Sequence, residues 1–195
     1  MSVEFQPSPQ RPWHVVSAST EPERSPQSHN ARSPQHFYYF AYGSCMCPVD
    51  LKRSLGEKMH PYVIGPAILQ GYRLGFFRRS RRRNCGVLDV VADSQSTVQG
   101  VLYRLPWSFS DRLDEREEGY RHETISVTCQ GRTYPTVRTY TVIEKHDSEH
   151  APNDWYFNIV LRGAITCGLP EQYCWQLFNH MHQLQQQELR LPKSA

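Results

Sequence analysis

Short apolar and aromatic runs, separated by turn residues, follow one another between residues 37 and 143. Runs of this length and composition are typical of β-strands. Gln130-Gly131 lies between the last two runs and predicts a hairpin, and Ala92–Thr97 is a polar link between two earlier ones. Seven strands in so short a segment favour a small closed or nearly closed barrel. The predicted strands cover residues 37–42, 62–69, 72–77, 87–91, 98–105, 124–129 and 133–143.

Helix-starting and helix-ending residues predict two short helices among these strands. Pro48 fits the first turn of a helix, where its missing N–H costs nothing. Gly56 is a typical helix-ending residue, so this helix runs to about residue 55. Ser110-Asp111 begins a second helix over 111–118, which Gly119 ends.

Two longer helices are predicted after the last strand. Asn153 or Asp154 caps a helix over 155–167. A helix over 171–187 follows Pro170. Its apolar stripe, with spacings of 4, 4 and 3, consists of Tyr173, Leu177, Met181 and Leu184. Because the strands come early and the helices late, the fold class is α+β: a small, mostly antiparallel β-barrel with a few flanking helices.

The composition changes this picture at the N-terminus. The chain has 195 residues, 14 prolines and a mean hydropathy of −0.64, which is polar for a single domain of this length. Residues 1–35 contain six of the prolines and seven serines, with no apolar periodicity. We expect a disordered Pro/Ser-rich tail over 1–35 and one domain over 36–190. A docking motif around Pro12-Trp13 is the alternative for the tail.

Several classes of protein are excluded by what the sequence lacks. It has no apolar run of the ~18–20 residues that a membrane helix needs, and its start does not resemble a secretory signal. Six cysteines without a CxxC pair favour reduced cytoplasmic thiols, and Cys45-x-Cys47 has the wrong spacing for zinc. His180-x-His182 points to different helix faces. We therefore expect a cytoplasmic protein without metal or cofactor.

The first candidate for chemistry is the segment Tyr42-Gly43-Ser44-Cys45-Met46, where a predicted strand meets a Gly-Ser turn and a helix. Backbone N–H groups and the positive helix end at such a turn favour an anion or a developing oxyanion. A purely structural turn is the alternative. No GxSxG motif surrounds Ser44, which argues against a serine nucleophile.

The second candidate is the acidic segment 113–120, LDEREEGY. Asp114 and Glu117 are three residues apart and share a helix face. A carboxylate beside apolar residues can have a raised pKa and act as general base and acid. A solvated charged helix face is the alternative reading.

The third candidate is a basic run with six arginines between residues 73 and 83, in a chain whose net charge is only +3. The run is expected to join two strands. A solvated loop, or a loop that touches an anionic substrate, fits better than a nucleic-acid site. The arginines are Arg73, Arg78, Arg79, Arg81, Arg82 and Arg83.

Taken together, these segments resemble the gamma-glutamylcyclotransferase-like family. The strand-turn motif of that family is similar to the turn above, and its LDxRE element, which carries the acidic residue, is similar to the second candidate. The resemblance spans about residues 38–180, with the motifs in the family's order. The matching segments are YFAYGSCM (39–46), GPAILQGYRLGF (65–76), CGVLDVV (85–91), VQGVLYRL (98–105), LDEREEGY (113–120) and WYFNIVLRGAITCGLPEQY (155–173).

Two departures from the family pattern affect the site. Cys45 stands where the family often has Asn, which leaves the backbone donors of the turn intact. The acidic segment has one extra residue, so counting from Leu-Asp gives Glu117 as the catalytic residue, and counting back from Gly119 gives Glu118. We prefer Glu117, because the LDxRE spacing is matched in full. On a helix, ~100° separates the two, so both are not expected to face one pocket.

The resemblance implies that an enzyme releases 5-oxoproline from a γ-glutamyl amine or peptide, glutathione among the compounds to test. Glu117, with Glu118 as second choice, acts as general acid and base. The implied substrate-binding residues are Tyr42, Gly43, Ser44, Cys45, Tyr120 and Tyr156. For the last two, a packed barrel tyrosine is the alternative. The expected partner is a small molecule, without nucleic acid or membrane, and the protein is a monomer or homodimer. A non-catalytic barrel that binds a small anion is the alternative function.

Overall fold

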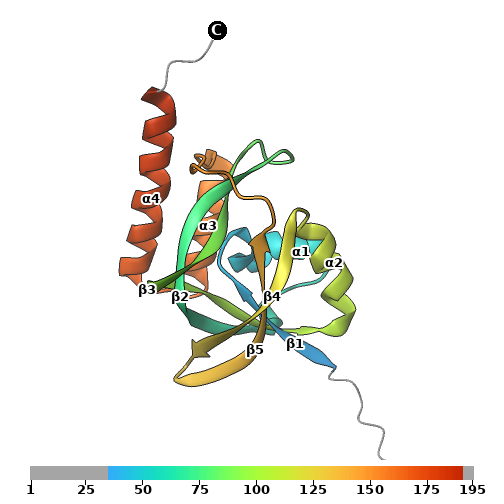
Figure 1. Ribbon diagram of the computed structural model, residues 1–195. Helices are drawn as coiled ribbons and strands as arrows, with labels where there is room; N and C mark the ends of the chain where they lie inside the picture. Colours follow the sequence, from blue (N-terminus) through green and yellow to red (C-terminus); the bar gives the residue numbers. More distant parts are fainter. Residues whose placement is uncertain (1–34, 191–195) are drawn as a thin grey trace, which may run out of the picture. The chain divides into compact units, whose positions relative to one another are not determined.

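The computed structural model describes residues 35–190 as one folded unit built on a β-barrel (Figure 1). The predicted tail, with its alternative docking motif, lies outside the described residues. Within the described range, none of the helices is both long and apolar enough to cross a bilayer.

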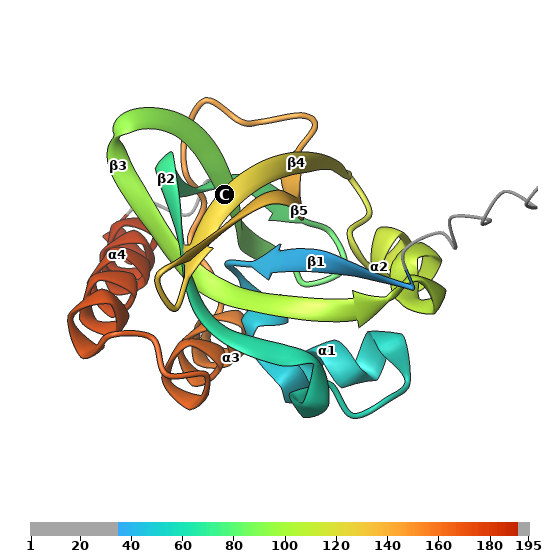
Figure 2. The same cartoon turned by 90° about the horizontal axis from the view of Figure 1, so that it is seen from below.

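Five strands form the barrel, and its helices lie outside it (Figures 1 and 2). The strands are β1 (His36–Ala41), β2 (Val63–Ser80), β3 (Cys85–Pro106), β4 (Tyr120–Cys129) and β5 (Arg132–Val142). The α-helices are α1 (Pro48–Leu55), α2 (Ser110–Arg116), α3 (Asp154–Thr166) and α4 (Glu171–Arg190). Three 3-10 helices are η1 (Ser44–Met46), η2 (His60–Tyr62) and η3 (Trp107–Phe109).

The barrel is closed in the order β1-β3-β2-β4-β5. All neighbours are antiparallel except β1 and β5, which close the barrel as a short parallel pair at Tyr38↔Val137 and Tyr39↔Arg138. A closed sheet leaves no long edge unpaired. The predicted α+β class, with a mostly antiparallel barrel and flanking helices, is confirmed.

The prediction of seven strands is wrong, because two pairs of predicted strands are continuous. Residues 62–69 and 72–77 both belong to β2, which has a register shift between Gln70 and Tyr72. The predicted polar link Ala92–Thr97 lies within the bounds of β3, but only its two ends pair with β2, Ala92 with Tyr72 and Thr97 with Gln70. Its side chains are mostly exposed and the register with β2 shifts there, so both the period of apolar residues and the pairing are interrupted inside the strand.

The helices agree more closely with the sequence pattern. Gly56 ends α1 in the left-handed conformation, with φ of 81°. Asn153 caps α3, since its Oδ1 accepts a hydrogen bond from the backbone N–H of Tyr156 at 2.9 Å. The shortest α-helix differs from the sequence prediction, because α2 ends at Arg116 and not at residue 118.

The helices cover the barrel in two pairs, α1 with α2 and α3 with α4 (Figures 1 and 2). The apolar stripe predicted for the last helix is buried: Tyr173, Leu177, Met181 and Leu184 all face the core. Helix α3 packs against η1 at Gly163, where a Cβ would lie 2.6 Å from the backbone nitrogen of Cys47. This close approach fixes the segment that follows β1.

Candidate functional site

The candidate site begins at the turn after β1. The chain leaves the strand at Ala41 and enters η1 within two residues, so the predicted strand-turn-helix order is present with a 3-10 helix inserted before α1. The Met46 N–H donates to the Gly43 carbonyl at 2.9 Å, which makes the turn tight. A Cβ at Gly43 would lie 3.1 Å from Tyr156 Oη and 3.6 Å from Leu88 Cβ, so the barrel wall leaves little room for a side chain there.

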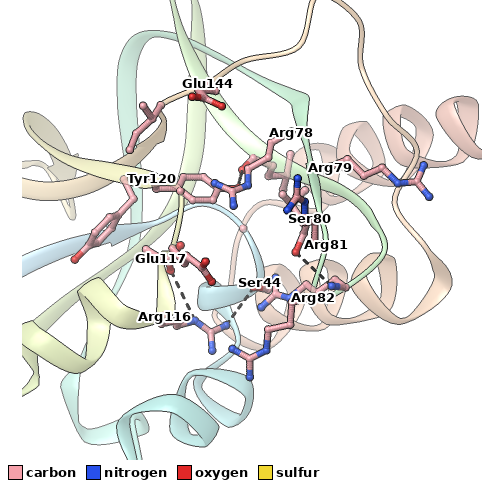
Figure 3. Close-up of a pocket in the computed structure, with 18 of the residues that line it drawn as sticks. Ser44, Arg78, Arg79, Ser80, Arg81, Arg82, Arg116, Glu117, Tyr120 and Glu144 are labelled. Atoms are coloured by element: carbon pink, nitrogen blue, oxygen red, sulfur yellow. Dashed lines mark hydrogen bonds and ion pairs between the residues drawn. The ribbon is translucent and has the colours of Figure 1, made fainter.

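The turn borders a cavity of about 980 Å³, a size typical of small-molecule sites. The other borders come from the end of β2 and the β2–β3 turn, the segment from α2 to β4, and the link between β5 and α3 (Figure 3). All six predicted substrate-binding residues and both candidate glutamates line it. The structure therefore brings the three sequence motifs together around one space.

Glu117 faces the turn. Its Oε1 accepts a hydrogen bond from Cys45 Sγ at 3.0 Å, and its side chain is 15% exposed. The Arg116 guanidinium lies beside both groups, with Nε 3.0 Å from Cys45 Sγ and 3.7 Å from Glu117 Oε1. The thiol thus lies between a cation and a carboxylate. It occupies the position at which the family pattern often has an Asn side chain.

Arg116 is held by groups on α1 and in the turn. Its Nη2 forms an ion pair with Asp50 at 2.6 Å, and both side chains are almost fully buried. It also donates to Ser54 Oγ and, at 3.3 Å, to Ser44 Oγ. Burial lowers the pKa of Arg116, but the neighbouring Cys45, Glu117 and Asp50 raise it by more, so the guanidinium stays charged.

Cys45 is a protonated hydrogen-bond donor at neutral pH. Burial is the main cause that raises the pKa of its thiol to about 12, while the Arg116 charge opposes the rise and Glu117 adds to it. A thiol with this pKa carries almost no thiolate near pH 7. Cys45 therefore supports the Glu117 carboxylate and is poorly suited to act as a nucleophile.

The predicted tyrosines lie in the cavity wall with their hydroxyls bonded to backbone. Tyr120 Oη donates to the Leu88 carbonyl at 2.9 Å, and Tyr156 Oη accepts from the Leu88 N–H at 3.1 Å. The hydroxyl of Tyr42 donates to the carbonyl of Tyr140. Burial raises the pKa of Tyr42, Tyr120 and Tyr156, so all three stay neutral. These contacts agree with the alternative of packed barrel tyrosines, whose rings border the site.

Glu118 differs from Glu117 in its surroundings. Both residues border the cavity, although they are adjacent in the sequence and were expected to be separated by ~100° on a helix. The physical reason is that α2 ends at Arg116, and Glu117, with φ −90° and ψ 36°, has left helical geometry. Glu118 is exposed and, within residues 35–190, makes no side-chain hydrogen bond or ion pair.

Asp114, which was expected to share a face with Glu117, lies elsewhere. Its Oδ1 accepts from Tyr140 Oη at 2.5 Å and lies 3.6 Å from Arg138. Sequence reasoning missed Asp50, the partner of Arg116. No local signal marks it, because the two residues are 66 positions apart and meet only when α1 packs on α2.

The site combines a shielded carboxylate, a neutral thiol donor and a tight Gly-Ser turn around one cavity. A carboxylate in such a place can accept and return a proton, while the turn and the Arg116 guanidinium can stabilise negative charge on a bound molecule. Among residues 35–190, no three His, Cys, Asp or Glu side chains gather as metal ligands.

Several known proteins are similar to this chain in sequence. The chain matches the AIG2-like family over residues 97–177. It is 33% identical over 158 residues to "Putative gamma-glutamylcyclotransferase YkqA" of Bacillus subtilis (strain 168), which covers 79% of this chain and 55% of that protein. It is 26% identical over 161 residues to "Gamma-glutamylcyclotransferase" of Mus musculus, with 75% of this chain and 80% of that protein covered.

Solved structures have the same fold. The crystal structure of YkqA from Bacillus subtilis superimposes with a TM-score of 0.70 over 76% of this chain and 55% of that chain. A structure named gamma-glutamyl cyclotransferase, 26% identical, gives a TM-score of 0.66 over 73% of this chain and 86% of that chain. The chain thus spans about half the length of YkqA and most of the shorter relative. On these agreements in sequence and fold, the chain is similar to members of the gamma-glutamylcyclotransferase-like family and shares their fold.

Proposed function

We propose that this protein releases 5-oxoproline from a γ-glutamyl amine or peptide, with Glu117 as general base and acid. The single observation that carries the proposal is the position of the Glu117 carboxylate, shielded in the cavity and hydrogen-bonded to Cys45 of the Gly-Ser turn. The names of the relatives favour the same activity for this cavity. The cavity is large enough for a γ-glutamyl dipeptide.

The reaction is an intramolecular aminolysis. Glu117 takes a proton from the α-ammonium of the γ-glutamyl group, and the freed amine attacks the γ-carbonyl carbon. The new C–N bond closes a five-membered lactam. The bond from that carbon to the leaving nitrogen then breaks as Glu117 returns the proton to that nitrogen, and the second proton lost by the attacking nitrogen goes to the released amine. No water is consumed, and the products are 5-oxoproline and the free amine.

The protein contributes mainly position and charge to this reaction. Nucleophile and electrophile belong to the same molecule, so the cavity has to select the folded-back conformer. Backbone N–H groups of Tyr42, Gly43 and Ser44 are the proposed donors to the α-carboxylate or the carbonyl oxygen. The buried Arg116–Asp50 pair holds Arg116 next to Glu117 and thereby fixes the carboxylate relative to the turn.

Substitution Glu117→Gln tests the proposal. Gln keeps the shape and accepts the Cys45 hydrogen bond, but it cannot take a proton. We expect 5-oxoproline release from γ-glutamyl dipeptides, γ-glutamyl amines or glutathione to fall by roughly 10²–10⁴-fold. Mass spectrometry measures the product, and an unchanged thermal unfolding curve shows that the variant folds.

The matched control is Glu118→Gln, which removes a neighbouring and exposed carboxylate from the same cavity border. It is expected to retain most of the activity. Unchanged turnover in Glu117→Gln, or a comparable loss in Glu118→Gln, would contradict the assignment of the base.

A non-catalytic barrel that binds a small anion is the second candidate, favoured by the arginines at the cavity border. It predicts binding of γ-glutamyl compounds without lactam formation. Calorimetry and product analysis on the same compounds distinguish the two functions.

A further inference from the structure

Five arginines at the end of β2 and in the β2–β3 turn border the cavity, opposite the segment that carries Glu117 (Figure 3). They are Arg78, Arg79, Arg81, Arg82 and Arg83. Five positive charges on one hairpin repel one another unless anions lie nearby. The partners that each of them has within the protein therefore indicate what the hairpin is built to hold.

Of these five arginines, Arg79 has its partners away from the cavity. It donates to Asn84 Oδ1 at 3.0 Å and lies 3.8 Å from Glu188 of α4. Its side chain extends away from Glu117 in Figure 3. Arg79 thus belongs to the contact between the hairpin and α4.

The other arginines have no carboxylate within ion-pair distance in the part of the chain that the structure describes. Half-buried Arg78 lies over the Tyr120 ring, 5.1 Å from its centroid. Half-buried Arg83 donates to Ser44 Oγ at 3.0 Å and lies over Trp155 and Tyr156. Both guanidiniums are held by rings and a hydroxyl, which fix their position without neutralising their charge.

Arg81 and Arg82 lie at the tip of the same hairpin, and both are exposed. Within residues 35–190 neither side chain forms a hydrogen bond or an ion pair with the protein. Two unpartnered guanidiniums at the opening of a cavity are suited to bind a planar anion, because each offers a fork of N–H donors.

Charge is divided across the cavity. The border formed by α2 and the α2–β4 segment carries Glu115, Glu117 and Glu118, whereas the hairpin border is arginine-rich. The link after β5 adds Glu144 and Asp147, together with Lys145, which is paired with buried Asp89. A molecule whose cationic end faces Glu117 and whose anionic end faces the hairpin fits this division.

We propose, resting on the proposed function, that the leaving half of the γ-glutamyl substrate carries at least two negative charges, which Arg81 and Arg82 bind and which Arg78 and Arg83 support. The γ-glutamyl group places its α-ammonium at Glu117, so the leaving half extends toward the hairpin. One carboxylate needs one guanidinium fork, and the cavity border offers four of them. The shared chemistry is a dianionic amine, either a dicarboxylate or a phosphate ester.

A charge series of substrates tests the proposal. γ-Glutamyl-ethylamide, γ-glutamyl-alanine and γ-glutamyl-glutamate have leaving halves with zero, one and two carboxylates, and γ-glutamyl-phosphoethanolamine carries a phosphate. We expect kcat/KM for 5-oxoproline release to rise roughly tenfold or more with each added charge. The dicarboxylate and phosphate arms distinguish the two sources of dianion. The preference should weaken from about 0.05 to about 0.5 M NaCl, because salt screens exposed charges.

The variant Arg81→Gln/Arg82→Gln assigns the preference to the hairpin tip. The ratio of kcat/KM between γ-glutamyl-glutamate and γ-glutamyl-ethylamide should fall toward one. The matched control, Arg104→Gln/Arg132→Gln, removes two exposed arginines outside the cavity and should keep the ratio.

Three outcomes overturn the proposal: equal kcat/KM across the series, a preference that does not respond to salt, or an unchanged ratio in the hairpin variant. Turnover of all substrates without a charge preference overturns this proposal and leaves the proposed function standing. No 5-oxoproline from any of the four compounds overturns both.

Discussion

At the scale of single residues, Cys45 has the most unusual surroundings in the site. Its sulfur accepts from Arg116 Nε and donates to Glu117 Oε1, at 3.0 Å each. The thiol is a weaker hydrogen-bond partner than an amide, and it lies between the guanidinium and the carboxylate, with Arg116 Nε 3.7 Å from Glu117 Oε1. A direct, bidentate Arg116–Glu117 pair would hold the carboxylate more tightly in its charged form. The Cys45 thiol therefore takes the place of such a direct pair between Arg116 and Glu117.

The raised pKa of Cys45 makes this residue testable by alkylation. A pKa of about 12, against an ordinary 9.0, reduces the thiolate fraction at pH 8 by about a thousandfold. Iodoacetamide should therefore label Cys45 at least that much more slowly in the native protein than in urea, as measured by peptide mass spectrometry. Cys167, which is only partly buried, is the internal control. Labelling of native Cys45 at the rate of an ordinary thiol would contradict the buried, protonated donor.

The sequence alone identified some residues of the candidate site and missed others. Glu117 and the turn were identified because the order of motifs resembles a family, and the structure brings them to one cavity. Asp50 was not identified, because its role depends on the packing of α1 against α2 and not on its neighbours in sequence. Periodicity describes one element at a time, so contacts between elements lie beyond it.

At the scale of elements, α3 positions the Gly-Ser turn through Gly163. The site of a Cβ on this residue lies 2.6 Å from Cys47 N and 2.8 Å from the carbonyl carbon of Met46, both backbone atoms. There is therefore no room for a side chain at Gly163, where α3 crosses η1. The sequence pattern predicted α3 well but gave no reason for a glycine in its middle, because that reason lies in another segment.

Substitution Gly163→Ala tests this contact. Alanine favours a helix by about 1 kcal/mol over glycine, but overlap with η1 should reverse the sign and destabilise the protein by roughly 1–3 kcal/mol. Urea unfolding measures the free energy. The control Asn158→Ala, at an exposed position of the same helix, should be neutral or slightly stabilising. If Gly163→Ala is as stable as the wild type, α3 does not hold η1 in this way.

The strands show a second limit of what the hydrophobic pattern can predict. The polar link Ala92–Thr97 has no apolar alternation, and only its two end residues pair with β2. The strand runs on between these ends without any buried side chain, so it leaves no mark in the hydrophobic pattern. The hairpin at Gln130-Gly131 was predictable, because both positions adopt positive φ values of 50° and 73°, which Gly favours and Gln tolerates less well.

At the scale of the whole folded unit, Glu149 joins three parts of the chain. It lies in the link between β5 and α3, and its Oε1 accepts from Phe76 N–H of β2 at 2.9 Å and lies 3.0 Å from His180 Nε2 of α4. Burial raises the pKa of Glu149, but the His180 hydrogen bond and charge, the Phe76 N–H and Arg73 together lower it below the usual 4.5.

This shift predicts a pH dependence of stability. A lowered folded pKa stabilises the protein above the unfolded pKa, about 4.5, and this stabilisation is lost as the pH falls through the folded value. Wild type should exceed Glu149→Gln by about 1–3 kcal/mol at neutral pH, and the difference should shrink below pH 4.5. Urea unfolding at several pH values measures it. Glu144→Gln, which changes an exposed carboxylate of the same link, is the control, and a difference that persists at low pH would contradict the prediction.

The parallel pair of β1 and β5 has a consequence for biosynthesis. Besides that pairing, Thr139 donates to the carbonyl of Phe40, 99 positions earlier in the chain. On the ribosome, the strand that leads into the Gly-Ser turn emerges first and lacks its closing partner until β5 follows. Glu117 has then already emerged, yet no cavity surrounds it. Nascent chains that stall before β5 should therefore expose apolar strands to chaperones and lack the site, although they contain both the turn and the glutamate.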